Sequence, residues 1–264
     1  MRVAATILLA VTFLLLGAPF ARADEITVAA AADLQFVMQE LAARFEKQTG
    51  HKVNVTVGSS GSFFSQIQNG APFDLFFSAD MDYPRKLEAT GFAEPGTLAI
   101  YAVGRIVVWA PLNSRVDVSR GWSALLDPSV QKIALANPQH APYGRAAEAA
   151  LRKAGIYEKV AAKLVYGENV SQAAQFVESG NAQAGIIAHS LAVSPALREK
   201  GRWWEIPADA YPPIEQGAIV LKSSPHKQTA QAFLNFVRGA QGRALLEQYG
   251  FTVPERESLS PVKP

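Results

Sequence analysis

Cysteine is absent from the 264 residues of the chain, and histidine occurs only four times. The lack of cysteine excludes disulfide bonds, a catalytic thiol and a thiolate metal site. It also leads us to expect no lipid anchor, because an exported lipoprotein carries its lipid on a cysteine at the cleavage point. The histidines are far apart in the sequence and form no metal-binding pair of the H-E-x-x-H kind. We therefore expect no cation site; the four are His51, His140, His189 and His226.

An excess of charge of one sign is also missing. The chain has 25 basic and 23 acidic side chains, and residues 1–23 contain two of the arginines and no acid. The remainder is therefore balanced, which argues against nucleic acid and against a membrane surface held by clustered basic charge. An anion site in such a chain has to be built locally from dipoles.

Residues 3–16 form an almost unbroken apolar run after the positively charged Arg2, and Ala21-Arg22-Ala23 is a small-x-small cleavage site. This layout is typical of a secretory signal peptide, residues 1–23. The run is shorter than the roughly 20 apolar residues that a membrane span needs. We expect an exported protein without a membrane anchor, and such a protein is retained in the periplasm, inside an outer membrane.

The remaining sequence alternates short apolar runs with amphipathic stretches, which favours an α/β fold. Strands are predicted over residues 26–31, 53–57, 75–78, 106–110, 133–136, 184–188 and 219–221. Helices are predicted over residues 34–49, 63–68, 84–89, 146–154, 171–179 and, as one long helical region, 228–249. Residues 255–264 contain proline, serine and charge without periodicity, and we expect a flexible tail.

Four loops between a predicted strand and a predicted helix are rich in small and polar residues: residues 29–33, 58–62, 136–144 and 167–171. In open α/β sheets ligands bind at such loops. The start of a helix offers free N–H groups and a partial positive charge, which suit an anion. The same residue types also serve as simple helix caps. Four such loops together would bind a small dianion through neutral donors.

An enzyme needs a nucleophile or an acid–base pair, and the sequence offers no convincing set. The motif Gly58-x-Ser60-x-Ser62 departs at its last position from the G-x-S-x-G pattern of hydrolases. We expect no enzyme activity and keep a secreted hydrolase only as an alternative.

Several motifs resemble those of the periplasmic molybdate-binding (ModA) family of ABC importers. GSSG at residues 58–61 is followed by QIQNGAPFDLFFSAD at 66–80, which is the most specific match. NPQHAPYG at 137–144, GENV at 167–170 and YGF at 249–251 support it. The resemblance runs in order from about residue 26 to residue 254.

This resemblance implies a two-lobed type II periplasmic-binding-protein fold with the ligand cleft between the lobes. Lobe one would comprise residues 24–104 and 214–254, and lobe two residues 105–213. It implies a monomeric receptor that captures molybdate or tungstate and delivers it to an inner-membrane ABC permease with its ATPase. No cofactor is implied. Sulfate, phosphate, chromate and, with less support, ferric ion remain alternative cargoes for the same fold.

Carried over position by position, the ligand-binding groups would be the loop at Asp33, the hydroxyl and N–H of Ser60, and the backbone N–H groups of Tyr143 and Val170. Their neighbours are weaker candidates: Ala32, Ser59, Asn169 and Ser171. Many family members have serine or asparagine where this chain has Asp33. Many also offer a tyrosine hydroxyl where this chain has Ala188 and His189.

Asp33 conflicts with the implied ligand. A carboxylate about 4 Å from a dianion costs about 8 kcal/mol at an effective dielectric constant of 20, which equals the free energy of micromolar binding. Either its side chain caps the helix predicted at residues 34–49 and only its N–H faces the anion, or it shares a proton with the anion. We expect the capping arrangement.

Overall fold

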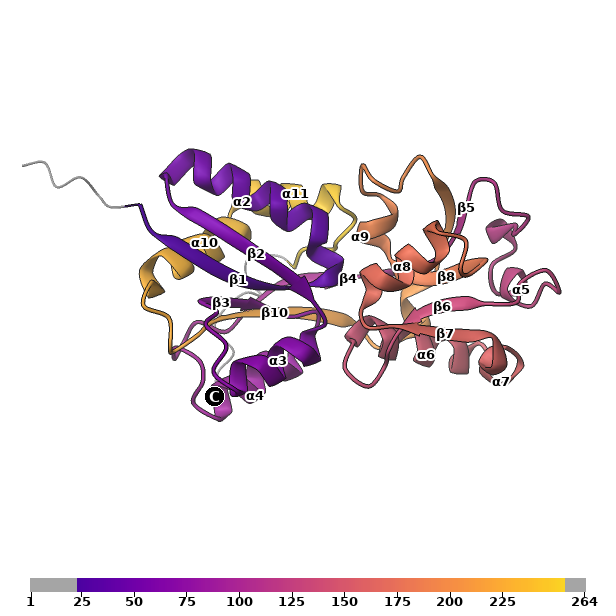
Figure 1. The fold of residues 1–264 in the computed structure, drawn as a ribbon, viewed down its shortest axis with the longest axis horizontal. Helices are drawn as coiled ribbons and strands as arrows, with labels where there is room; N and C mark the ends of the chain where they lie inside the picture. Colours follow the sequence, from indigo (N-terminus) through magenta and orange to yellow (C-terminus); the bar gives the residue numbers. More distant parts are fainter. Residues whose placement is uncertain (1–22, 255–264) are drawn as a thin grey trace, which may run out of the picture.

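The computed structural model describes residues 23–254. The predicted signal peptide, except its last residue, and the predicted tail lie outside the described residues. The structure consists of two lobes that lie side by side, each built around one five-stranded sheet covered by helices (Figure 1). The predicted α/β fold with two lobes is confirmed.

The sheet of the first lobe has the strand order β2-β1-β3-β10-β4. Strands β1, β2 and β3 are parallel to one another, whereas β10 runs antiparallel to both β3 and β4. Their bounds are β1 Glu25–Ala31, β2 Lys52–Gly58, β3 Leu75–Phe77, β4 Ala99–Gly104 and β10 Ile214–Val220. The carboxyl ends of β1 and β2 point toward the second lobe (Figure 1).

Helices cover both faces of this sheet (Figure 1). Helices α2 (Gln35–Thr49), α10 (Lys227–Arg238) and α11 (Ala240–Gln248) pack on one face, where Phe45, Phe233 and Leu246 are buried. Helices α3 (Ser60–Gln68) and α4 (Asp82–Ala89) pack on the other, around Phe63, Phe76 and Leu87. The turn between β1 and α2 is a short 3-10 helix, η1 (Ala32–Leu34). Burial of apolar surface on both faces fixes the carboxyl ends of the strands in place.

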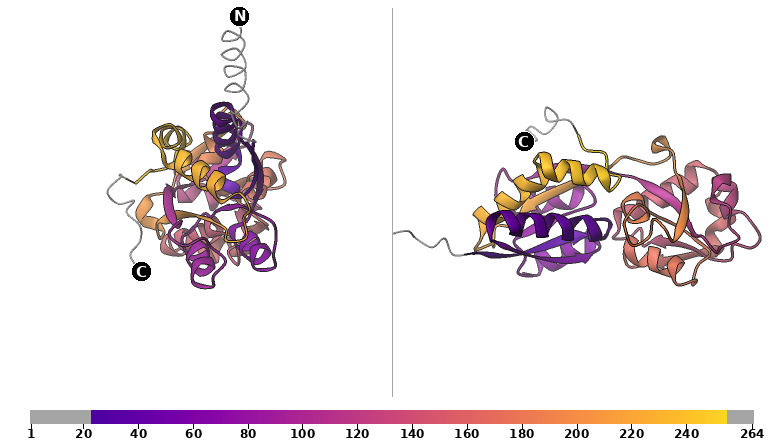
Figure 2. Two further views of the ribbon diagram at one scale, coloured as in Figure 1. Left: turned by 90° about the vertical axis from the view of Figure 1, so that its left-hand side faces the viewer. Right: turned by 90° about the horizontal axis from the view of Figure 1, so that it is seen from above.

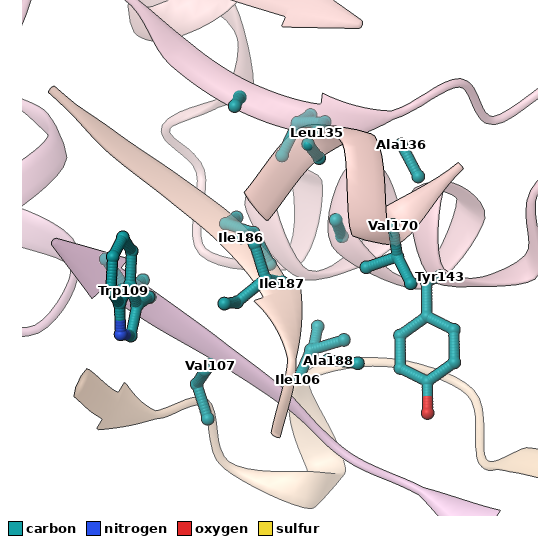
Figure 3. Packing of buried hydrophobic residues seen from close by; sticks show 14 of the residues in the cluster. Ile106, Val107, Trp109, Leu135, Ala136, Tyr143, Val170, Ile186, Ile187 and Ala188 are labelled. Atoms are coloured by element: carbon teal, nitrogen blue, oxygen red, sulfur yellow. The ribbon is translucent and has the colours of Figure 1, made fainter. Parts of the chain in front are cut away.

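The sheet of the second lobe has the order β7-β6-β8-β5-β9. Its strands are β5 Ile106–Pro111, β6 Ile133–Ala136, β7 Leu164–Gly167, β8 Ala184–Ala188 and β9 Gly201–Glu205. Its helices are α5 Trp122–Leu125, α6 Pro142–Lys153, α7 Tyr157–Val160, α8 Val170–Glu178 and α9 His189–Ala192, with 3-10 turns η2 Val118–Arg120, η3 Ala161–Lys163 and η4 Ala208–Ala210. Figure 3 shows the buried side chains of this lobe, with Tyr143 and Val170 at one edge of the cluster.

The chain crosses from the first sheet to the second between Gly104 and Ile106, and it returns before Ile214. After α11, Thr252 pairs with Val103 of β4, so this segment returns to the first sheet. In the view from above, the last helices lie on the first lobe only (Figure 2). The two lobes are therefore joined by short segments that permit one to move relative to the other.

Three differences from the predicted elements have local causes. Helix α3 begins at Ser60 rather than at residue 63, because Ser59 caps it. The predicted long helix breaks at Gly239, whose backbone is extended (φ −75°, ψ 174°). Strands β4, β7 and β9 were not predicted from the sequence, and their residues do not alternate regularly between buried and exposed. Within residues 23–254, none of the helices has both the length and the apolar character needed to cross a membrane.

Candidate functional site

A narrow cavity lies where the two lobes meet. It encloses about 200 Å³ between protein atoms, including the part open to solvent. Only about 10 Å³ of this space is wide enough for the centre of a water molecule. Its walls come from both lobes: Ala31, Ala32, Asp33, Gly58, Ser59, Ser60, Ala79, Ala141, Pro142, Tyr143, Asn169 and Val170. None of these residues is a lysine or arginine, so polar contacts here come from backbone groups, hydroxyls, one amide and one carboxyl.

The structure brings the sequence-predicted residues together. The four principal candidates, Asp33, Ser60, Tyr143 and Val170, all line the cavity, as do Ala32, Ser59 and Asn169 among the weaker ones. The exception is Ser171. Its hydroxyl donates to Gln35 across the lobes and does not line the cavity.

Three helices start at this cavity: α3, α6 and α8. Ser59 caps α3 by accepting the N–H of Ser62 at 3.2 Å, and Asn169 caps α8 by accepting the N–H of Gln172 at 3.0 Å. The first N–H groups of a helix have no partner within the helix. Ser60 and Val170 are the first residues of α3 and α8, and Tyr143 follows Pro142 at the start of α6. Their N–H groups therefore remain available to an anion, and the helix dipoles favour negative charge there.

Ser60 also supplies a hydroxyl. The residue is only 1% exposed, and its Oγ accepts the N–H of Ala79 at 2.9 Å. A serine hydroxyl can accept and donate at the same time. Because the contact with Ala79 uses the oxygen as acceptor, the hydroxyl proton is free to point into the cavity.

The expectation that Asp33 caps a helix is wrong. It lies within η1, and neither η1 nor α2 has a side-chain cap. Its Oδ2 instead accepts the hydroxyl of Tyr143 at 3.0 Å and Nε2 of Gln216 at 2.7 Å. Its Oδ1 is buried and has no hydrogen-bond partner among residues 23–254. Two strong donors from distant parts of the chain outweigh the local preference for a cap.

The Asp33 carboxyl belongs to a buried polar cluster. Tyr101 donates to Oε1 of Gln216 at 2.5 Å, and Nε2 of Gln216 also contacts the Tyr143 hydroxyl at 3.0 Å. Burial raises the pKa of Asp33 to about 6, although the hydrogen bonds from Gln216 and Tyr143 act in the opposite direction. Burial and the nearby Asp33 raise the pKa of Tyr143 well above its ordinary value.

Sequence reasoning missed Gln216 and Tyr101. The sequence contained a signal for Gln216, which alternates with Ile214 and Ala218 as residues on one face of a strand do. In the structure Gln216 is fully buried. A lone amide among apolar strand residues is buried only where it has hydrogen-bond partners.

Polar contacts close the cavity at its rim. Ser59 Oγ lies 2.9 Å from Nδ1 of His140, and Ser62 donates to Glu168 at 2.7 Å. The N–H of Gly61 donates to the carbonyl of His140 at 2.9 Å. Since each contact joins the first lobe to the second, the structure is the closed state. His140 thus reaches the cleft, whereas His189 does not line the cavity and packs near Trp203.

A second, larger cavity of about 760 Å³, also including the part open to solvent, lies beside the first and shares Ala79 and Pro142 with it. Its charged residues include Asp80, Arg85, Arg145 and Glu215. Arg145 bridges the lobes to Asp80 at 2.5 Å. Within the described part of the chain, no group of three or more histidine, aspartate or glutamate side chains is arranged to hold a metal ion.

Comparisons with known proteins agree with this geometry. The chain matches the model of the bacterial extracellular solute-binding protein family over residues 26–252. It is 40% identical over 231 residues to the molybdate-binding protein ModA of Azotobacter vinelandii, covering 88% of this chain and 91% of that protein. The corresponding identity to ModA of Rhodobacter capsulatus is 39%, covering 88% and 89%.

The solved structure of the Azotobacter vinelandii periplasmic molybdate-binding protein superposes with a TM-score of 0.82 at 36% identity, covering 87% of this chain and all of that one. The sulfate-binding protein SubI of Mycobacterium tuberculosis superposes with a TM-score of 0.71 at 18% identity, covering 89% and 88%. At that identity only the fold is shared.

Proposed function

Because the chain belongs to the family of bacterial extracellular solute-binding proteins, we propose that it is the periplasmic receptor of an ABC importer and that its cargo is molybdate or tungstate. One observation carries the proposal. Three helix starts and the Ser60 hydroxyl meet at one cavity that no lysine or arginine lines. The identity to the ModA proteins of Azotobacter vinelandii and Rhodobacter capsulatus supports the choice of cargo.

The donors are sufficient in number and strength. A hydrogen bond to a charged acceptor contributes about 1.5–3 kcal/mol. About five such hydrogen bonds are available. They come from the N–H groups of Ser60, Tyr143 and Val170, from the Ser60 hydroxyl and from the η1 loop. After the costs of association and closure, such a set supports micromolar binding, about −8 kcal/mol. Neutral donors give this affinity without an ion pair.

Capture requires motion of the lobes. In the closed state only about 10 Å³ of the cavity is wide enough for a water molecule, so we expect the lobes to part before an oxyanion enters and then to close on it. Ser60 comes from the first lobe, whereas Tyr143 and Val170 come from the second. All donors therefore reach the anion only when the lobes meet, which couples binding to closure.

The finer parts of the proposal follow from the family. Residues 1–23 would be removed on export, and the mature monomer would deliver its anion to an inner-membrane permease with its ATPase. The lobes would comprise residues 24–104 with 214–254, and residues 105–213. The protein would have no catalytic activity and no cofactor.

Calorimetric titration of the purified mature protein tests the cargo. We expect one site that binds molybdate and tungstate at least at micromolar affinity, and sulfate and phosphate far more weakly. The fold does not decide between anions. Saturation by sulfate or phosphate without any response to molybdate would refute the assignment. Small-angle scattering should show a smaller radius of gyration when molybdate is added.

A further inference from the structure

Among residues 23–254, Asp33 has the only carboxyl group that lines the small cavity between the lobes. It is 1% exposed, and no lysine or arginine lines the same cavity. An ionised carboxylate in this place would repel a dianion across a short distance with little solvent screening. An ionised Asp33 would therefore weaken binding of the proposed ligand. This repulsion is absent if the carboxyl is neutral when the ligand is bound.

The hydrogen bonds determine which oxygen can carry a proton. Tyr101 donates to Oε1 of Gln216, which turns Nε2 of that amide toward Asp33. Oδ2 of Asp33 then accepts two donors, from Gln216 and Tyr143. An oxygen that accepts two hydrogen bonds has no room for its own proton. A proton on Asp33 therefore resides on Oδ1, the buried oxygen without a partner among residues 23–254.

The other titratable groups near Asp33 do not supply a positive charge. From α6 come Tyr143 and Arg145, and Arg145 is paired with Asp80. From β4 comes Tyr101, and from α9 comes His189, whose pKa is lowered by burial and by Arg105. The first turns of α2 and α8, which pack against η1, contain no charged side chain.

Resting on the proposed function, we propose that Asp33 binds the oxyanion as a neutral carboxylic acid, with Oδ1–H as a hydrogen-bond donor, so that capture takes up one proton. The carboxylate gains this proton from solvent as the lobes close, and no covalent bond to the anion forms or breaks. The raised pKa of Asp33, about 6, is in the direction that this requires. Oδ1–H then joins the N–H groups and the Ser60 hydroxyl as a neutral donor.

Proton uptake makes affinity depend on pH. Above the pKa of Asp33 in the free protein, each pH unit weakens binding about tenfold, because a proton must be taken up first. We expect the dissociation constant for molybdate to rise about a hundredfold between pH 6 and pH 8. Titrations at one pH in buffers of different ionisation enthalpy should reveal uptake of close to one proton at pH 8.

The Asp33→Asn variant presents an amide N–H where the acid presents Oδ1–H. It should bind molybdate with nearly constant affinity from pH 6 to pH 8, without proton uptake, and more tightly than the parent protein at pH 8. The matched control is His140→Gln, because His140 lies at the rim of the same cavity, with Nδ1 2.9 Å from Oγ of Ser59. That variant should keep the pH dependence of the parent.

The outcomes separate this inference from the proposed function. Molybdate binding by the parent that is flat with pH and takes up no proton would overturn the role of Asp33 and leave the cargo intact. A pH dependence that disappears in His140→Gln but persists in Asp33→Asn would also overturn it. No molybdate binding by the parent and Asp33→Asn at any pH would overturn the cargo, and this inference with it. Proton uptake by the parent can be measured even if the variant does not fold.

Discussion

The two neighbouring cavities between the lobes differ in size, charge and the state of their polar groups. The larger one, about 760 Å³ against about 200 Å³, contains Arg85, Arg145, Asp80 and Glu215, and its Arg145 is already paired with Asp80. The smaller one has no basic side chain. Three helix starts and a serine hydroxyl meet there, and they supply hydrogen-bond donors that no protein group has taken. An anion site is defined by donors that no protein group has taken, rather than by volume or by the number of cations.

The largest effect should come from keeping the lobes apart. A Cβ on Gly61 would lie 2.7 Å from both the carbonyl oxygen and Cβ of His140 in the other lobe. Gly61→Ala should therefore remove the donors of the second lobe from the small cavity. Loss of two hydrogen bonds to a charged acceptor predicts at least a hundredfold weaker molybdate binding.

Calorimetry and small-angle scattering would measure the loss of affinity and of closure. Ser65→Ala, at an exposed position of the same helix, is the matched control and should change neither. Unchanged affinity in Gly61→Ala would mean that the bound protein does not use this contact between the lobes.

The next effect concerns a single donor. Ser60→Ala should weaken molybdate binding by about 1.5–3 kcal/mol, if the hydroxyl donates to the charged ligand as we propose. Ser62→Ala removes a hydroxyl at the rim that donates to Glu168 and does not line the cavity. Titration of both variants should therefore give a much smaller loss for Ser62. Equal losses would mean that the Ser60 hydroxyl only accepts the N–H of Ala79 and does not contact the anion.

Replacing an acid by its amide should affect stability more in the small cavity than in the larger one. Folding raises the pKa of Asp33 from 3.8 to about 6, so the folded state favours the neutral acid. The cost of burying its ionised form is absent below about pH 4 and complete above about pH 6. It is at most about 3 kcal/mol, and opening of the lobes relieves part of it. Asp33→Asn should thus stabilise the unliganded protein at pH 8, by about 1 kcal/mol, and not at pH 4.

Burial raises the pKa of Asp80 in the larger cavity as well, but the pair with Arg145 acts in the opposite direction. Asp80→Asn removes the burial cost and the ion pair together, so it should change the unfolding temperature at pH 8 less than Asp33→Asn does. Thermal unfolding of both variants at the two pH values is the measurement. A loss of stability in Asp33→Asn at pH 8 would show that the carboxylate is well accommodated there.

The smallest effect should come from a cation of the larger cavity. Arg85 lines that cavity and not the small one. Arg85→Gln should change molybdate affinity by no more than about threefold, since exposed charges are screened by solvent. A tenfold loss in calorimetry would mean that the larger cavity takes part in binding.

Local patterns were enough to predict the strand-to-helix loops, because parallel strands bring their carboxyl ends to one edge of a sheet. They did not predict the orientation of Asp33. Its partners Tyr143 and Gln216 are 110 and 183 residues away in the sequence. The preference of aspartate for a helix cap acts within a few residues, so the sequence around Asp33 contained no sign of them. Whether these residues bind the ligand stays a prediction.

Most of the proposed donors are backbone N–H groups at the starts of α3, α6 and α8. No substitution except proline removes an N–H group, so such a site tolerates side-chain changes that would abolish a site built from arginine and lysine. It is instead vulnerable to insertions and deletions. One residue more or less in the loops before Ser60, Tyr143 or Val170 would rotate the helix start and aim its N–H elsewhere. The lengths of these loops, more than the identity of their residues, therefore determine whether the proposed site stays intact.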